Sequence, residues 1–207
     1  MTTVGLRERK KERTRAAILD AALDLFLEQG YESTTVEQIA GAVEISPRTF
    51  FRYFTSKDHL VLWFHDHGEA IMLDILAERP HDEPPFASLM SALRAVLADL
   101  EESTPEDAER FLKLRRLFER YPHLVGLSAA RGAETERRLA AEIAARRGTD
   151  PDEDRFAHLI VAFAMSVMRV GMECPRDAAS LTELKERTAQ TLEMAERCLR
   201  PGWDQQP

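Results

Sequence analysis

Apolar residues recur at helical spacing along nearly the whole chain, and the alternation typical of strands is almost absent. A first helix is expected over about residues 9–29, because Gly30 suits the left-handed residue that follows a helix end. Its apolar stripe, spaced i, i+4, i+7 and i+8, consists of Ile18, Ala22, Leu25 and Phe26. The pattern therefore predicts an all-α fold that begins with an amphipathic helix.

Two short helices are expected next. A hydroxyl cap at Thr34 or Thr35 precedes a helix over about residues 36–43. Ser46 caps a third helix over about residues 47–53, in which Pro47 takes the first position, where its missing N–H costs nothing. Three N-terminal helices with a tight turn between the second and the third are typical of a helix-turn-helix unit.

The rest of the chain is predicted as six longer helices separated by prolines, glycines and hydroxyl caps. They cover about residues 57–79, 86–101, 105–121, 123–147, 152–173 and 177–199. About nine helices result in total. We divide the chain into an N-terminal helix-turn-helix domain, residues 1–56, and a C-terminal helical domain for ligand binding and dimerisation, residues 57–207.

The composition of the 207 residues, 44% hydrophobic and 31% charged, is that of an ordinary soluble globular protein. Cys174 and Cys198 are too few for a disulfide framework and no CxxC spacing occurs, so reduced thiols are expected. The most apolar stretch, residues 159–168, is far shorter than the roughly 20 residues that span a bilayer. Without an apolar signal-peptide core near the N-terminus, a cytoplasmic location is expected.

The net charge of −8 argues at face value against a nucleic-acid partner, but its distribution reverses that inference. Residues 1–15 carry six bases against two acids, and residues 46–57 carry three bases and no acid. The intervening residues 16–45 carry six acids and no base. Two basic clusters thus flank an acidic helix pair, and any of those acids that face a duplex would oppose binding.

The third helix carries side chains suited to reading DNA. The second helix of a helix-turn-helix motif lies in the major groove, where Arg48 could pair with guanine and Phe51 could contact a thymine methyl. Nearby hydroxyl groups and basic side chains could donate hydrogen bonds to phosphate oxygens. The predicted DNA-contacting residues are Thr35, Ser46, Pro47, Arg48, Thr49, Phe51, Arg52, Tyr53 and Lys57. In the alternative interpretation, the aromatic residues all belong to the core and the basic side chains are merely solvated.

Residues 18–60 resemble the N-terminal DNA-binding domain of TetR-family transcriptional regulators. Residues 34–40, TTVEQIA, match the second-helix pattern of that family, and residues 46–57, SPRTFFRYFTSK, match its recognition helix and the start of its fourth helix. The segment RTFFRYF within this run is similar to a subgroup found among actinobacterial-type members, including regulators linked to acyl-CoA ligands.

Two positions depart from the family pattern. Glu44 stands in the turn that usually holds glycine, where a left-handed backbone would cost about 1 kcal/mol. Arg48 stands where glycine or proline is frequent, so the bases that it reads cannot be taken over from relatives.

The resemblance implies a homodimeric regulator, usually a repressor, that leaves a palindromic operator when a small ligand binds its C-terminal helices and moves the fourth helix. Flexible methionines and flat aromatic rings suit an adaptable apolar pocket, so we expect an apolar or acyl-type effector. Candidate lining residues are Trp63, Phe64, His67, Met72, Met90, Phe111, Phe118, Met165, Met168 and Met172. The same residues also suit a plain core.

A dimer is expected independently from the last two helices. The last helix has a narrow apolar seam and the helix before it is apolar nearly all round, so two copies could form a four-helix interface. The predicted interface residues are Phe156, Ile160, Phe163, Val167, Leu184, Thr188, Leu192 and Ala195. The alternative is that both seams are core within one chain.

Enzymatic function is the rival class. A helical di-metal site needs two Glu-x-x-His motifs, and the one instance, ending at His81, is broken by Pro80. No GxSxG, GxGxxG or P-loop pattern occurs, so no enzyme, metal or cofactor is expected. A DNA-binding protein without an effector, or an activator, remains open; a large cavity in the C-terminal domain would favour the ligand-gated regulator.

Overall fold

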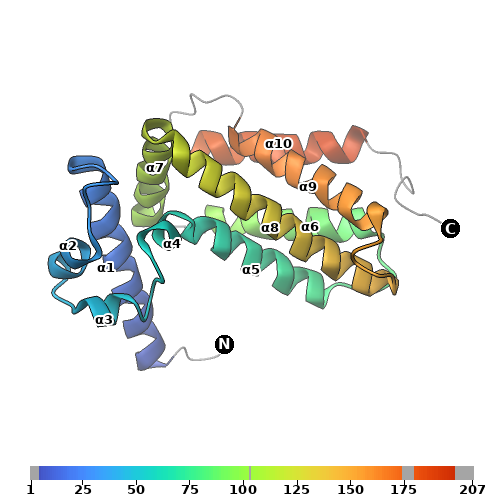
Figure 1. Ribbon diagram of the computed structural model, residues 1–207. Helices are drawn as coiled ribbons and strands as arrows, with labels where there is room; N and C mark the ends of the chain where they lie inside the picture. The colour runs from blue at the N-terminus through green and yellow to red at the C-terminus, as the bar shows by residue number, and fades with distance from the viewer. Residues whose placement is uncertain (1–4, 103, 174–179, 199–207) are drawn as a thin grey trace. The chain divides into compact units, whose positions relative to one another are not determined.

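The computed structural model describes residues 5–102, 104–173 and 180–198, and all regular structure in these ranges is helical (Figure 1). Ten helices lie there: α1 (Leu6–Glu28), α2 (Val36–Ala42), α3 (Pro47–Phe50), α4 (Lys57–Val61), α5 (Trp63–Glu78), α6 (Pro85–Glu101), α7 (Pro105–Arg120), α8 (Pro122–Arg147), α9 (Arg155–Glu173) and α10 (Leu181–Cys198). The all-α prediction is confirmed. Cys174 and the predicted ends of the last helix at residues 177 and 199 lie outside the described residues.

The predicted helix over residues 57–79 is two helices, which corrects the expected number from nine to ten in the described ranges. Ser56 caps α4 by accepting the His59 N–H at 3.1 Å. At Leu62 the backbone has φ −87° and ψ −2°, which ends α4, and α5 starts at Trp63. Apolar spacing did not reveal this break, because an interruption of one residue leaves the helical phase on both sides nearly intact.

The chain forms two compact units. Unit 1 comprises residues 1–64 and 105–128, and unit 2 comprises residues 65–104 and 129–207. This geometric division differs from the functional division predicted after residue 56. The reason is that α7, which follows α6 in sequence, packs on α1.

Unit 1 has its own apolar core beneath the helix-turn-helix motif. The predicted stripe of α1 supplies Ile18, Ala22 and Phe26, all with no exposed surface, while Leu25 is only partly buried. The same core contains Phe50 of α3 together with Leu117 of α7. The recognition helix therefore rests on a core to which residues from both halves of the sequence contribute.

Unit 2 is built around α6, α9 and α10, which pack against one another (Figure 1). The α9–α10 packing is close, because a Cβ added at Gly171 would lie 2.8 Å from the Cα of Thr188. The fully or almost fully buried side chains of its core include Leu76, Leu89, Leu93, Leu139, Ile143, Ile160, Val161 and Leu192. Glycine at position 171 is therefore a requirement of this packing rather than of the backbone conformation.

Half of the predicted interface residues are core within the single chain. Buried in unit 2 are Ile160, Leu184, Thr188 and Leu192. Partly buried against the same core are Phe156, Val167 and Ala195. Phe163 is 43% exposed, the largest exposed fraction that is recorded for a predicted interface residue, and the location of an interface between two copies stays a prediction.

The sequence indicated no membrane-spanning stretch, but α9 is long and apolar enough over Arg155–Met172 to cross a membrane by length and composition alone. A core helix of a soluble protein passes the same test. Ala157, Ile160, Val161 and Ala164 of α9 are fully buried in the core of unit 2. Its apolar character is thereby explained in part by packing.

Candidate nucleic-acid interface

The second helix is fixed by a reciprocal cap at its start. The Thr35 hydroxyl accepts the Gln38 N–H at 3.3 Å, and the Gln38 side chain accepts the Thr35 N–H at 2.8 Å. Of the two capping residues left open by the sequence, Thr35 is thus the cap. Thr34 is buried, and its hydroxyl donates to the Gly30 carbonyl at 2.8 Å. The Thr35 hydroxyl, predicted to contact DNA, is exposed but already satisfies the helix end.

The turn between α2 and α3 has a left-handed residue, and that residue is Glu44 with φ +55°. The Ile45 N–H donates to the Ala40 carbonyl at 3.0 Å, and the Glu44 N–H donates to the Gly41 carbonyl at 3.1 Å. These two bonds form a Schellman motif, which ordinarily has glycine at the left-handed position. The left-handed backbone on which the predicted cost at Glu44 depended is thus present. The turn fixes the angle at which the chain enters α3.

The third helix starts at Pro47, as predicted. The Ser46 hydroxyl accepts the Thr49 N–H at 3.1 Å. α3 proper ends at Phe50, earlier than expected, but the turn continues because the Tyr53 and Phe54 N–H groups both donate to the Phe50 carbonyl, at 2.8 and 3.0 Å. A short recognition helix with one further turn results.

The aromatic residues of this segment divide between core and surface. Phe50 and Phe54 are buried, with exposed fractions of 0% and 1%, whereas Phe51 is 53% exposed. Arg48 and Arg52 are also exposed. The buried rings anchor the segment, and Phe51 with the two arginines is available to a partner. The interpretation that every aromatic residue is core therefore does not hold for Phe51.

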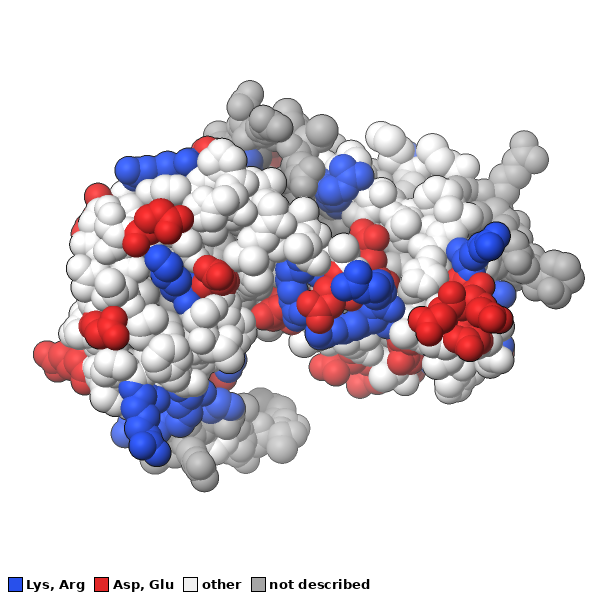
Figure 2. Space-filling view, viewed as in Figure 1, with Lys and Arg blue, Asp and Glu red and all other residues white. Residues whose placement is uncertain are grey.

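The two basic clusters of the sequence meet in unit 1. The hydrogen bond with Arg52 lowers the pKa of the Tyr53 phenol, and a hydrogen bond with Thr14 and the charge of Lys11 act in the same direction, against burial. The Arg52 guanidinium lies 5.2 Å from the centroid of the Tyr53 ring. Figure 2 shows Lys and Arg gathered at the end of this unit where α1 begins. Tyr53 thus joins the basic start of α1 to the segment after α3.

Lys57 has a different position from the other predicted contacts. Its ammonium donates to the Tyr31 carbonyl at 2.8 Å and to the Thr34 carbonyl at 3.3 Å, and lies 4.4 Å from the centroid of the Tyr31 ring. These bonds tie the start of α4 to the loop between α1 and α2. Lys57 therefore has a structural role. Its contact with phosphate stays a prediction and would use an N–H that is not engaged in these two bonds.

Two family models match the chain. The one described as "Bacterial regulatory proteins, tetR family" matches residues 18–62, and the one described as "MftR C-terminal domain" matches residues 87–197, more than half of the chain. The chain belongs to the TetR family of transcriptional regulators. The family consists of DNA-binding regulators and not of enzymes, as the sequence predicted.

Individual relatives agree with this assignment. The chain is 45% identical over 168 residues, 80% of its length, to the HTH-type transcriptional regulator TcmR of Streptomyces glaucescens, covering 74% of that protein. It is 38% identical over 88 residues, 40% of its length, to an HTH-type transcriptional repressor of Mycobacterium tuberculosis, covering 47% of it. The structure described as "SmeT-Triclosan complex" has the same fold, with a TM-score of 0.53, 20% identity, and coverage of 94% of this chain and 98% of that one.

The acidic residues of this TetR-family protein's first helix are paired in a way that the sequence did not predict. Asp20 and Asp24 form ion pairs with Arg110 and Lys113 of α7. The i, i+3 spacing of the two bases was visible in the sequence, but their partner helix was not, because it lies about 90 residues earlier. The acids of α1 are therefore partly neutralised within unit 1.

The predicted pocket residues divide between the two units. Unit 1 holds Trp63, Phe64, Phe111 and Phe118, and unit 2 holds His67, Met72, Met90, Met165, Met168 and Met172. The Phe64 and Phe111 rings meet edge to face at 5.7 Å, and Met72 and Met90 are buried core. His67 is exposed, and its Nε2 lies 3.0 Å from an Asp99 oxygen. Which of these residues line a pocket stays a prediction.

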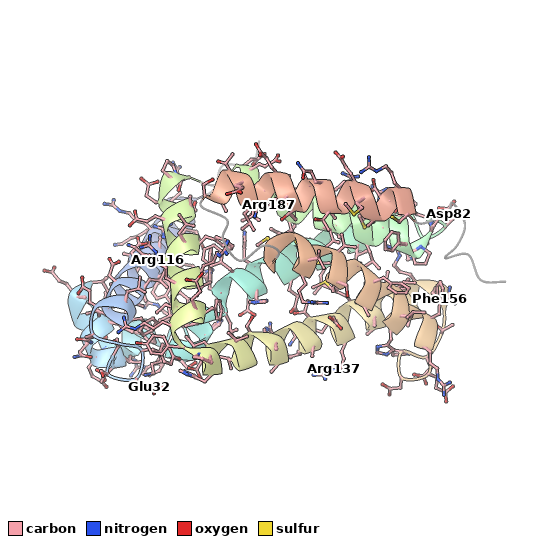
Figure 3. All side chains as sticks on the ribbon, turned by 90° about the horizontal axis from the view of Figure 1, so that it is seen from above. Glu32, Asp82, Arg116, Arg137, Phe156 and Arg187 are labelled. Carbon is pink, nitrogen blue, oxygen red and sulfur yellow. The ribbon has the colours of Figure 1, made fainter. Side chains whose placement is uncertain are left out.

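Unit 2 also has a surface pocket of about 430 Å³ at the connection between α8 and α9. It is lined by Arg147, Thr149, Asp150, Glu153, Asp154, Arg155 and Phe156. The Asp154 carboxylate accepts from the Ala157 N–H and from Thr149, so it caps α9 (Phe156 is labelled in Figure 3). Among the described residues, no group of three or more His, Cys, Asp or Glu side chains is placed to hold a metal ion.

Proposed function

We propose that this protein is a homodimeric repressor that binds a palindromic operator through α3 and is released by a small apolar or acyl-type effector. The observation that carries the proposal is the exposed face of the recognition segment, Arg48, Phe51 and Arg52, held on buried Phe50 and Phe54 beside the basic start of α1. Guanidinium groups and an exposed aromatic ring suit guanine edges, phosphates and thymine methyls. A protein that binds an operator would act where the DNA lies, in the cytoplasm.

Repression is supported by the relative from Mycobacterium tuberculosis, which is named a transcriptional repressor and whose similarity extends over 88 residues. A protein that occupies an operator can block transcription without any further activity. Activation would need an additional surface for the transcription machinery, and no observation on this chain favours one.

A homodimer is supported by exposed apolar side chains on α9 and α10. Leu159, Phe163 and Val170 of α9 are 51%, 43% and 44% exposed, and Met194 of α10 is 56% exposed. The three α9 residues are spaced i, i+4 and i+11, which places them along one side of the helix. Large apolar residues gathered in this way are typical of interaction surfaces. A two-fold dimer would present two copies of α3 to two half-sites, so the operator should be palindromic.

An apolar effector is supported by the methionines of unit 2. Met165 and Met168 pack against a core that contains Met72 and Met90, and unbranched thioether side chains can rearrange around a ligand. The SmeT structure contains triclosan, a small molecule, which shows what that relative binds. An acyl-type molecule is the alternative within the same apolar class.

Selection of bound genomic fragments by the purified full-length protein tests the proposal. We expect recovered fragments to share an inverted repeat whose half-sites lie about one helical turn apart or a multiple of it. A reporter driven by the recovered promoter should be silenced by the protein. Fragments without a shared motif would leave only non-specific binding, and a reporter that is switched on would identify an activator.

A further inference from the structure

We infer that α7 and the corner after it are part of the DNA-reading unit, in which Arg110 and Tyr121 act as positioning residues for the recognition helix. The inference rests on the proposed operator binding and adds to it a second segment of the chain. Neither residue is expected to touch DNA. Each holds a part of the helix-turn-helix motif in place from residues 105–128, which were predicted to belong to the effector-binding domain.

The apolar contribution of this segment is large. Leu114, Leu117 and Leu124 are 4%, 0% and 0% exposed, and they share one core with Ile18 and Phe50. Burying a leucine stabilises the fold because it removes apolar surface from water. Residues 1–64 alone would expose the core surface that these three side chains cover. The recognition helix is seated on the same core through Phe50, so the segment stabilises the reading unit itself.

Ion pairs fix α7 along α1. The Arg110 Nε lies 2.6 Å from Asp20 Oδ1 and its Nη2 lies 2.8 Å from Oδ2, a bidentate pair in which Arg110 is only 12% exposed. Its Nη1 donates to Asp107 at 2.6 Å. The hydrogen bond with Asp20 raises the pKa of Arg110 further above its usual range. A planar guanidinium with all three nitrogens engaged sets both the distance and the rotation of α7 on α1.

A second ion pair lies one turn further along both helices. The Lys113 Nζ lies 2.6 Å from Asp24 Oδ1 and 2.8 Å from Glu109 Oε1. The hydrogen bond with Asp24 raises the pKa of this lysine. An ammonium group can form ion pairs in many geometries. The Lys113 pair therefore neutralises charge on α1 more than it orients α7. We therefore assign the orienting role to Arg110.

The corner between α7 and α8 holds the loop between α1 and α2. The Tyr31 N–H donates to the Tyr121 hydroxyl at 3.2 Å, and Arg120 donates to the Leu27 carbonyl at 2.9 Å. Gly30 has φ +99°, and a Cβ there would lie 3.2 Å from the Tyr121 hydroxyl. Another residue at this position would be strained by the backbone conformation, and its Cβ would also lie close to Tyr121.

The far side of the same loop is held by α4. The Tyr31 hydroxyl donates to the Asp58 carboxylate, and Lys57 donates to the Tyr31 carbonyl. Burial, followed by the bond to Asp58, raises the pKa of the Tyr31 phenol, so it stays a donor. The loop that leads into α2 is therefore clamped between Tyr121 and the start of α4. Since two backbone hydrogen bonds close the turn between α2 and α3, we expect a shift of this loop to move the recognition helix.

Two single variants with a matched control test the inference. Arg110→Met removes the bidentate pair but keeps an unbranched apolar stem, and Tyr121→Phe removes one hydroxyl. Arg116→Met removes the same charge from an exposed position of the same helix (Figure 3). Affinity is measured on two probes: an operator duplex recovered by the wild-type chain from genomic fragments, and a shuffled duplex of equal length and composition. Far-UV circular dichroism and thermal melts show whether each variant is folded.

A positioning role predicts that specific binding falls while non-specific binding persists, because the phosphate contacts of the shuffled duplex need no register. We expect Arg110→Met to weaken operator binding about tenfold or more and shuffled-duplex binding less than about twofold. Arg116→Met should weaken both by the same small factor. Arg110→Asp combined with Asp20→Arg rebuilds the pair with unchanged net charge, so it should recover operator binding that Arg110→Asp alone loses.

The inference is overturned if folded Arg110→Met and Tyr121→Phe both bind the operator as the wild type does. It is also overturned if Arg110→Met weakens both duplexes equally and no more than Arg116→Met, since that result shows a charge effect alone. Should Arg110→Met fail to fold, the charge-reversed pair and Tyr121→Phe decide by the same criterion. If the wild-type chain recovers no DNA at all, the proposed function fails first, and the inference fails with it.

Discussion

Glu44 occupies the left-handed position of a Schellman motif, where glycine is the usual residue. The Schellman motif at the end of α2 is complete, with both of its hydrogen bonds, although the left-handed position holds glutamate at φ +55°. It is the one residue other than glycine with positive φ among those that the structure describes. The strain is therefore local, and the burial of Ile39 and Phe50 on either side keeps the turn in place.

Replacing Glu44 with glycine should therefore stabilise the protein. Relief of the left-handed conformation is worth about 1 kcal/mol, part of which is offset because glycine also loosens the unfolded chain. We expect a higher thermal midpoint for Glu44→Gly. The matched control Glu44→Gln removes the charge and keeps the Cβ, so its midpoint should stay close to that of the wild type. Equal midpoints for all three proteins would show that the turn is not strained.

His65 is a second residue whose environment has a measurable consequence. Burial lowers its pKa from the ordinary 6.5; the charge of Asp66 opposes this shift and that of Arg131 reinforces it. A histidine with a lowered pKa in the folded state is neutral there and binds a proton more readily when unfolded. Its contribution to stability is thus present above about pH 6.5 and is lost as the pH falls through the folded-state pKa.

When the pH is lowered from 7.5 to 5.5, we expect the thermal midpoint of the wild type to decrease. The decrease should be smaller in His65→Gln. The matched control is His81→Gln, which replaces an exposed histidine and should retain the full decrease. A decrease of the same size in His65→Gln and the wild type would show that protonation of His65 is not coupled to folding.

Local signals predicted several helix boundaries, although not the start of α5 at Trp63, and they could not predict what each helix packs on. Ser46 with Pro47, the capping threonine before α2 and Gly30 after α1 each act within one turn, and the structure has all three where the sequence placed them. The assignment of α7 to the effector domain rested on its place in the sequence. Its pairing with α1 depends on contacts between residues about 90 positions apart, which one sequence does not reveal.

The pair α9 and α10 shows the same limit. The narrow seam on α10 was predicted correctly as a packing surface, but the single chain uses it internally, since Leu184, Thr188 and Leu192 are buried against unit 2. Periodicity identifies an apolar face and not the partner that covers it. The exposed residues of α9, Leu159, Phe163 and Val170, lie on another side of this helix. Because the helix is apolar nearly all round, the sequence pattern did not distinguish them from core residues.

The close approach of these two helices gives a prediction at this scale. Gly171→Ala would place a Cβ 2.8 Å from backbone, so α9 and α10 must move apart, and we expect a loss of about 1–3 kcal/mol in the free energy of unfolding. Gly132→Ala in α8 is the matched control, because its added Cβ would point into open space, with no packing neighbour within 4 Å. That control should stabilise the helix by up to about 1 kcal/mol. Similar effects of the two changes in urea unfolding would contradict the close packing.

At the scale of the whole molecule, the net charge of −8 is a sum over segments with different tasks. The basic start of α1 and the bases around α3 meet in unit 1, and α7 supplies Arg110 and Lys113 to the acids of α1. The acidic residues 16–45, which seemed to oppose DNA, are thereby partly neutralised within the unit that would bind it. The distribution of charge in the folded unit, and not the total, is what bears on a nucleic-acid partner.

The proposed dimer predicts a molecular mass near twice 23.5 kDa by light scattering at micromolar concentration. Phe163→Asp would place a charge in the exposed apolar stripe of α9 and should yield a folded monomer with weakened operator binding. Val125→Asp is the matched control, because Val125 is 51% exposed but belongs to α8 in unit 1. A dimer that survives Phe163→Asp would place the interface elsewhere, and a monomeric wild type would contradict the proposal.

The affinity of Arg48→Ala for the selected operator shows whether the exposed face of α3 reads the operator sequence. A fluorescence anisotropy titration compares wild type and variant on the operator and on the shuffled duplex at one fixed salt concentration. Loss of a bidentate pair with guanine should cost about 1–3 kcal/mol on the operator and much less on the shuffled duplex, so that the ratio of the two affinities falls. An unchanged ratio would show that Arg48 does not read the DNA sequence and that the proposed role of α3 is wrong.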